Sequence, residues 1–258
     1  MTRKPKVGIS MKLYQNLPDQ AIEYAKIMKN LLLNEDAVEV FYLPTATSLY
    51  PVANELNDSS ILYGSQNIAP EANGAYTGEI SIEALKELNC SLVEIGHYER
   101  RTIFQENNKM IADKITLTLE YGLSPILCLG EETQQIDSAK LKSIFYDDLN
   151  ECLAASKKNL YSRLIIAYEP FWAIGKEKAA DADYVHRSHQ LIRECLTELL
   201  DETTAELITI IYGGSVSKNN AYQLTQHKDV DGLFVGRFGH DPNQLLSIVD
   251  EVKQAKKY

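Results

Sequence analysis

Short apolar runs recur along the whole chain, separated by longer segments that contain many polar residues. Each run is rich in branched residues and has the length of a buried β-strand rather than of a helix. About eight can be recognised: Val7–Ile9, Val38–Phe41, Ile61–Tyr63, Leu92–Ile95, Pro125–Leu129, Leu164–Tyr168, Leu207–Ile211 and Leu233–Val235. A chain built in this way places its strands in one large sheet, open or closed.

The segments between the runs carry apolar residues at the spacing of one helix face. Two examples are Ala21, Tyr24, Ala25, Met28, Leu31 and Leu32 near the start, and Leu245, Ile248, Val249 and Val252 near the end. Strand and helix in alternation predict parallel strands joined by right-handed crossovers. No linker rich in Pro, Gly or Ser divides the chain, so we expect residues 1–258 to form one domain.

Polar residues follow several of the strands and favour a closed barrel over an open sheet. They include Lys12, His97, Glu169, Gly213–Ser215 and Gly236. In a (β/α)8 barrel the active site gathers at the C-terminal ends of the strands, where these residues fall. The sequence therefore predicts a single (β/α)8 barrel of eight parallel strands with outer helices.

Composition excludes several classes of partner. A formal net charge of −10 repels nucleic acid and anionic membrane surfaces, and no basic stripe offsets it. No apolar run is long enough to span a bilayer, and the basic start Met1–Lys6 leads into a strand rather than a signal-peptide core. The four cysteines lie far apart, which indicates reduced thiols and no metal site. We therefore expect a cytoplasmic protein.

Two segments closely resemble the triosephosphate isomerase family: Gly96–Arg101 (GHYERR) and Ala167–Gly175 (AYEPFWAIG). Further matches occur in the same order along nearly the whole chain. They are Gln66–Asn67, Gly74–Ser81, Cys128–Glu131, Ile211–Val216 and Asp229–Gly232. The resemblance implies a TIM barrel that interconverts dihydroxyacetone phosphate and glyceraldehyde 3-phosphate through an enediol, with no cofactor and no metal.

The resemblance also implies roles for three residues. Glu169 is the expected base, and its apolar neighbours Phe171 and Trp172 would strip water from the carboxylate and make it more basic. His97 is expected to polarise the substrate carbonyl as a neutral ring, which a helix starting just after the strand would favour. Lys12 is expected to stabilise the developing negative charge. Glu99 is expected to be a partner of Lys12 and not a catalytic residue.

The expected phosphate site consists of backbone N–H groups in turns. By resemblance it includes Gly175, Ser215 and Gly236. The chain departs from the family pattern at two places beside it: Ser10-Met11-Lys12 stands for the usual Asn-Trp-Lys, and Gly236-Arg237 for the usual Gly-Gly. The Arg237 guanidinium would either pair with Asp241 or a neighbouring carboxylate, or reach the phosphate itself. We count Ser10, Lys12 and Arg237 as substrate-binding residues too.

These departures, together with Lys176-Glu177, leave other functions open. The first alternative is an isomerase of a four-carbon ketose phosphate, because all the altered residues lie near the expected substrate. The second is a barrel that binds sugar phosphates without catalysis, since a fold alone does not prove an activity. The presence of Lys12, His97 and Glu169 together argues against the second alternative.

Two loops have expected functions by resemblance. Residues Trp172 to Lys178 would form a mobile lid over the phosphate, held by Tyr212 and Ser215. The loop Gln66 to Glu79 would project into a second subunit through Thr77, so we expect a homodimer.

Overall fold

Eight parallel strands close into a barrel in the computed structural model, which describes residues 3–176 and 179–256. They are β1 (Lys6–Ser10), β2 (Glu39–Leu43), β3 (Leu62–Ser65), β4 (Leu92–Ile95), β5 (Ser124–Leu129), β6 (Ile165–Tyr168), β7 (Thr209–Gly213) and β8 (Gly232–Val235). Each strand pairs with its neighbours in the sequence, and Lys6 of β1 aligns with both Glu39 and Gly232. The predicted (β/α)8 barrel is confirmed.

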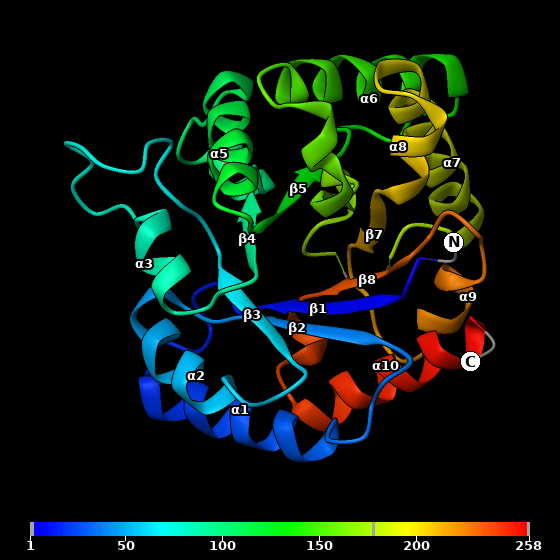
Figure 1. Ribbon diagram of the computed structural model, residues 1–258. Coiled ribbons are helices and arrows are strands. Elements are labelled where there is room, and N and C mark those ends of the chain that lie inside the picture. The colour runs from blue at the N-terminus through cyan, green and yellow to red at the C-terminus, as the bar shows by residue number, and fades with distance from the viewer. Residues whose placement is uncertain (1–2, 177–178, 257–258) are drawn as a thin grey trace.

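Helices surround the strands (Figure 1). They are α1 (Pro18–Leu31), α2 (Leu49–Leu56), α3 (Ile82–Glu87), α4 (Tyr98–Thr102), α5 (Asn108–Glu120), α6 (Ser138–Leu153), α7 (Ala182–Leu199), α8 (Glu202–Leu207), α9 (Ala221–Thr225) and α10 (Pro242–Ala255). Short 3-10 turns occur at η1 (Ala46–Ser48), η2 (Lys158–Arg163), η3 (Phe171–Ala173) and η4 (Arg237–Gly239). In the described part of the chain, none of the helices has the length and apolarity to cross a bilayer.

The apolar stripes expected from the sequence face the barrel. In α1 the buried residues are Ala21, Tyr24, Ala25 and Met28, and in α10 they are Leu245, Ile248, Val249 and Val252. One strand was predicted to start two residues too early. Leu207 ends α8 and is 46% exposed, so β7 begins only at Thr209. Asp201 is the reason, because its carboxylate accepts the N–H of Thr204 at 2.8 Å and stabilises the start of α8.

A second apolar cluster fills the inside of the barrel. It contains Phe41, Leu43, Leu92, Ile126, Cys128, Ile165, Ala167, Ile211 and Phe234. Gly8 belongs to the same space, because a Cβ at this position would lie 1.8 Å from the Phe41 ring. The interior is therefore a packed core, and loss of the Phe41 ring would cost about 3–5 kcal/mol. The site lies above this core, at the C-terminal ends of the strands.

Candidate active site

Lys12 stands two residues after the end of β1 in a left-handed conformation, with φ 47°. Its ammonium donates to Glu99 Oε1 at 2.7 Å, as the sequence predicted. Burial lowers the pKa of Lys12, but the carboxylates of Glu169 and Glu99 outweigh this effect and hold its pKa above the usual value. Lys12 is therefore a fixed positive charge at the mouth of the barrel. Backbone strain of this kind occurs where surrounding contacts enforce it.

His97 follows β4 and forms the N-terminal cap of α4. Its Nδ1 accepts the backbone N–H of Glu99 at 3.1 Å. In a neutral imidazole one ring nitrogen accepts and the other donates, so this bond leaves the hydrogen on Nε2. Nε2 lies 3.4 Å from Glu169 Oε2. The short helix after β4 therefore aims a hydrogen-bond donor across the hollow.

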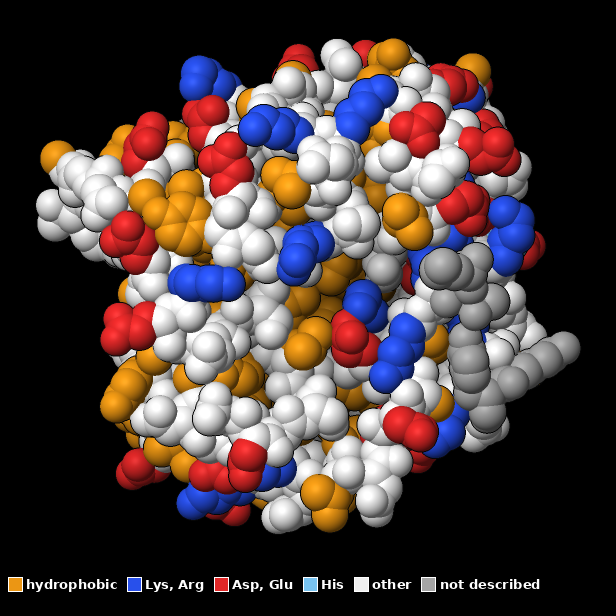
Figure 2. Space-filling model, in the orientation of Figure 1, with side chains coloured by type: hydrophobic (Ala, Val, Ile, Leu, Met, Phe, Trp, Pro, Cys, Tyr) orange, Lys and Arg blue, Asp and Glu red, His pale blue; other side chains and the backbone are white. Residues whose placement is uncertain are grey.

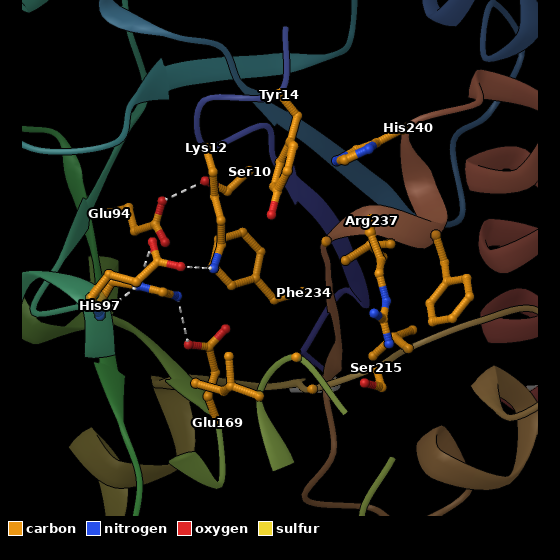
Figure 3. A pocket seen from close by; sticks show the side chains of 18 residues that line it. Ser10, Lys12, Tyr14, Glu94, His97, Glu169, Ser215, Phe234, Arg237 and His240 are labelled. Atoms are coloured by element: carbon orange, nitrogen blue, oxygen red, sulfur yellow. Dashed lines mark hydrogen bonds and ion pairs between the residues drawn. The ribbon is translucent and has the colours of Figure 1, made fainter. Parts of the chain in front are cut away.

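Glu169 follows β6 and is 7% exposed. Its Oε2 has no hydrogen-bond partner among the described residues. Gly213 makes room for the carboxylate, because a Cβ there would lie 2.5 Å from Glu169 Oε1. Poor solvation and a missing donor leave a lone pair of this carboxylate available to accept a proton. The structure thus brings Lys12, His97 and Glu169 to one hollow, as expected from the sequence (Figure 3).

The hollow of about 180 Å³ also reaches the three turns expected to hold phosphate. Gly175 and Ser215 have left-handed φ values of 73° and 48°. A Cβ added at Gly175 or Gly236 would meet no atom of the described chain within 4 Å, so both turns face open space. Figure 2 shows lysine and arginine side chains around the hollow at the centre of this face, although the net charge of the chain is −10. This end of the hollow suits an anion.

Comparison with known proteins agrees with this geometry. A family model described as triosephosphate isomerase matches residues 5–252. The probable triosephosphate isomerase 2 of Listeria monocytogenes is 42% identical over 254 residues, covering 98% of this chain and 99% of the relative. The triosephosphate isomerase of Protochlamydia amoebophila is 35% identical over 240 residues, covering 93% and 90%.

The chain belongs to the triosephosphate isomerase family. The resemblance found in the sequence is therefore confirmed over nearly the whole chain. The triosephosphate isomerase 2 of Listeria innocua has the same identity and coverage as its relative from Listeria monocytogenes.

Of the residues that line the hollow, Glu94 is the acidic one that the sequence analysis missed. Glu94 of β4 points into the barrel, is 3% exposed, and accepts the hydroxyl of Ser10 at 2.7 Å (Figure 3). Burial raises the pKa of Glu94, and the charge of Glu169 adds to this effect, whereas the hydrogen bond from Ser10 and the charge of Lys12 oppose it. The sequence did contain a signal for Glu94, because an acidic residue in the middle of an apolar strand is unusual. Glu94 and Ser10 both line the hollow.

Arg237 does not adopt the first of the two orientations expected for it. Its guanidinium donates to the backbone carbonyl of Lys176 and lies over the Phe238 ring, 5.0 Å from the centroid. Asp241 is not its partner, because that carboxylate caps α10 through the N–H of Asn243 at 2.9 Å. The first expectation is therefore wrong in its partner. Arg237 still lines the hollow, beside the turn of Gly236.

The expected lid begins at a firmly held residue. Trp172 Nε1 donates at 2.7 Å to Glu131, a carboxylate that is 2% exposed and also accepts the hydroxyl of Tyr184 at 2.6 Å. Tyr168 donates to the same carboxylate at 3.2 Å. Glu131 was not singled out in the sequence, and only the tertiary structure brings its partners together. Three donors on one buried carboxylate fix the start of the segment.

The two residues expected to hold the segment contact the chain at and just beyond its far end. Ala180 donates its N–H to the Tyr212 hydroxyl at 3.2 Å. Ser215 Oγ donates to the carbonyl of Lys176 at 2.6 Å, so this carbonyl accepts from Ser215 and Arg237 together. Glu177 and Lys178 lie outside the described residues. Across the ranges 3–176 and 179–256, no group of three metal-ligating side chains gathers.

Proposed function

We propose that the protein interconverts dihydroxyacetone phosphate and glyceraldehyde 3-phosphate. The observation that carries the proposal is the approach of His97 Nε2 to Glu169 Oε2, at 3.4 Å, beside the Lys12 ammonium. A carboxylate, a neutral hydrogen-bond donor and a fixed cation are the groups that an enediol mechanism requires. Membership of the triosephosphate isomerase family supports the same reaction.

The proposed reaction moves one proton between adjacent carbons. The Glu169 carboxylate removes a proton from C1 of dihydroxyacetone phosphate, and the electron pair of that C–H bond forms the double bond of the enediolate. His97 Nε2–H donates to the carbonyl oxygen as negative charge develops there, and the Lys12 ammonium stabilises this charge. His97 gives its Nε2 proton to O2 and takes the proton of the C1 hydroxyl in exchange, and Glu169 then returns the first proton to C2, which yields the aldehyde at C1. Turn N–H groups of Gly175, Ser215 and Gly236 would hold the phosphate meanwhile.

A coupled turnover assay with Glu169→Gln tests this assignment. The amide has the shape of the carboxylate but cannot accept the proton, so we expect a loss of roughly 10²- to 10⁴-fold in kcat with the fold retained. Glu132→Gln is the matched control, because Glu132 follows the neighbouring strand β5 but is exposed. Near-wild-type turnover by Glu169→Gln would refute the role of Glu169 as base.

Isomerisation of a four-carbon ketose phosphate is the second candidate. A specific observation favours it: Ser10 and Glu94 place two polar side chains at the end of the hollow away from the phosphate turns. Parallel assays of three- and four-carbon ketose phosphates rank the two activities. If neither substrate turns over while phosphate esters still bind, the protein is a sugar-phosphate-binding barrel without catalysis, and both isomerase activities are refuted.

We also propose that residues 1–258 form one domain and that the protein is a homodimer. The loop Gln66 to Glu79 extends away from the barrel (Figure 1), and Thr77 within it is exposed. Apolar side chains are exposed close to the site: Leu13 by 77%, Tyr14 by 67% and Phe104 by 60%. A second subunit would bury them. Light scattering that finds an active monomer would refute the dimer.

A cytoplasmic location remains a proposal as well. It is supported by the four cysteines, which are all buried and free. Proteins that keep such thiols reduced are typical of reducing compartments.

A further inference from the structure

Glu94 is the unusual element of this site. It occupies an inward position of β4, where its neighbours inside the barrel are apolar, among them Leu92, Cys128 and Phe234. A carboxylate buried in such surroundings is costly unless hydrogen-bond donors compensate it. Ser10 supplies one donor, to Oε2. The other oxygen, Oε1, accepts no hydrogen bond from the described residues, and Glu94 lines the hollow.

The position of Glu94 relative to the reacting groups indicates what the carboxylate can reach. Figure 3 shows Glu94 and Ser10 across the hollow from Ser215 and Arg237. A ligand whose phosphate lies at the Ser215 turn and whose reacting carbons lie between His97 and Glu169 therefore directs its far end toward Glu94. That end of a sugar phosphate carries hydroxyl groups.

There is space beyond this point. A second hollow of about 520 Å³ adjoins the first one and shares with it the side chains of Ser10, Lys12, Glu94 and His97. Its other walls include Thr45 and Asn67. Leu13 and Phe104, which a second subunit would bury, line the second hollow alone, whereas Ser10, Lys12, Glu94 and His97 line both hollows where they meet. A chain with one further hydroxylated carbon therefore meets no closed wall at Glu94 before it reaches the surface that the second subunit would cover.

We propose that Glu94 is a specificity-determining residue that accepts a hydrogen bond from a hydroxyl on the substrate carbon farthest from the phosphate, favouring ketose phosphates longer than three carbons. This inference rests on the proposed isomerase function and, of the two candidate substrates, favours the four-carbon ketose phosphate. Ser10 orients the carboxylate by holding Oε2, which leaves Oε1 for the substrate. Hydrogen bonds to charged groups discriminate strongly, since the loss of one leaves a buried acceptor without a donor.

The first test measures binding without turnover. Glycerol 3-phosphate and the four-carbon polyol phosphates erythritol 4-phosphate and threitol 4-phosphate are titrated into the protein by calorimetry. We expect Glu94→Val to lower the affinity for the better four-carbon ligand, relative to glycerol 3-phosphate, by roughly 10- to 100-fold. Glu94→Gln keeps an acceptor oxygen without the charge. The ratio of its affinity for the four-carbon ligand to its affinity for glycerol 3-phosphate should therefore fall less, by roughly 3- to 10-fold.

Cys128→Val is the matched control. Cys128 belongs to the same interior cluster, and neither hollow includes it in its lining. Its ratio of affinities should remain that of the wild type. Glu94→Val should fold, because replacing a buried charge by an apolar group among apolar neighbours is often neutral or stabilising. Glu94→Gln should fold because its amide oxygen can still accept the Ser10 hydroxyl. Thermal unfolding checks this point for all three variants.

The second test measures the ratio of kcat/KM for a tetrulose phosphate to that for dihydroxyacetone phosphate. We expect this ratio to fall in Glu94→Val in parallel with the ratio of affinities. Equal changes for the short and long ligands in both Glu94 variants would overturn the proposal and make Glu94 a structural residue. If the wild type turns over neither ketose phosphate, the isomerase function fails, while the ratio of affinities still decides the role of Glu94.

Discussion

The buried ring of His189 makes the stability of the protein depend on pH. His189 lies in α7 and is fully buried, with Nδ1 3.0 Å from the carbonyl of Asp229. Its Nε2 has no hydrogen-bond partner among the described residues, and the Tyr168 ring packs on it edge to face at 5.6 Å. Burial lowers the pKa of His189 from 6.5 to about 3, although the bond to Asp229 opposes this effect. The folded protein therefore keeps this ring neutral.

The sign of the effect follows from which state binds the proton. Below pH 6.5 the unfolded chain protonates His189 and the folded chain does not, until about pH 3. Folding therefore loses stability as the pH falls through this window, with a slope of up to about 1.4 kcal/mol per pH unit. Between pH 7.5 and pH 5 the loss from this residue is about 2 kcal/mol, a large share of a typical 5–15 kcal/mol.

Urea unfolding at a series of pH values between 5 and 7.5 measures this loss. In His189→Asn the loss attributable to residue 189 should vanish, so the curve of unfolding free energy against pH should be flatter by about 2 kcal/mol over the range. Ser188→Ala is the control: Ser188 is equally buried but does not titrate, so this variant should keep the wild-type slope at a lower overall stability. Parallel curves for the wild type and His189→Asn would disprove the reasoning.

Two further predictions concern the lid. Glu131→Leu leaves the buried donors Tyr168 and Tyr184 and the partly buried Trp172 without an acceptor, so we expect a loss of about 3 kcal/mol or more of unfolding free energy. The emission of Trp172, the sole tryptophan, should also change, and an unaltered melting curve would contradict this prediction. Arg237→Gly removes a donor to the Lys176 carbonyl, so binding of three- and four-carbon ketose phosphates should weaken alike, by roughly 2- to 10-fold in titrations. A loss confined to the longer substrate would instead make Arg237 a chain-length determinant.

The strand pattern was predictable because buried strands are short apolar runs, and the barrel follows from their number and alternation with helices. Lys12, His97 and Glu169 were predictable as neighbours for the same reason, since residues after parallel strands meet at one end of a barrel. The start of β7 was not predictable. A capping bond from Asp201 decides there between helix and strand, and the apolar residues Leu207 and Ile208 fit both.

Contacts between residues far apart in the sequence account for the remaining differences. Whether Glu94 points into the barrel depends on the register of β4 between β3 and β5, which its own sequence does not specify. The direction of Arg237 depends on where the backbone of Lys176 passes, 61 residues earlier in the chain. Local sequence patterns specify neither the register of β4 nor the position of the Lys176 backbone. Both residues belong to the site, so the uncertain positions were the ones that bear on substrate choice.

The pairing of β1 with β8 has a consequence for how the protein is made. β1 begins at Lys6, but β8, its second partner strand, starts only at Gly232. One edge of β1 therefore has no strand to pair with until the ribosome has synthesised most of the chain. Unpaired edges of nascent sheets attract other chains. Such long-range closure is also slow. We expect the growing polypeptide to depend on chaperones until β8 emerges, and folding yield to fall steeply with temperature and expression level.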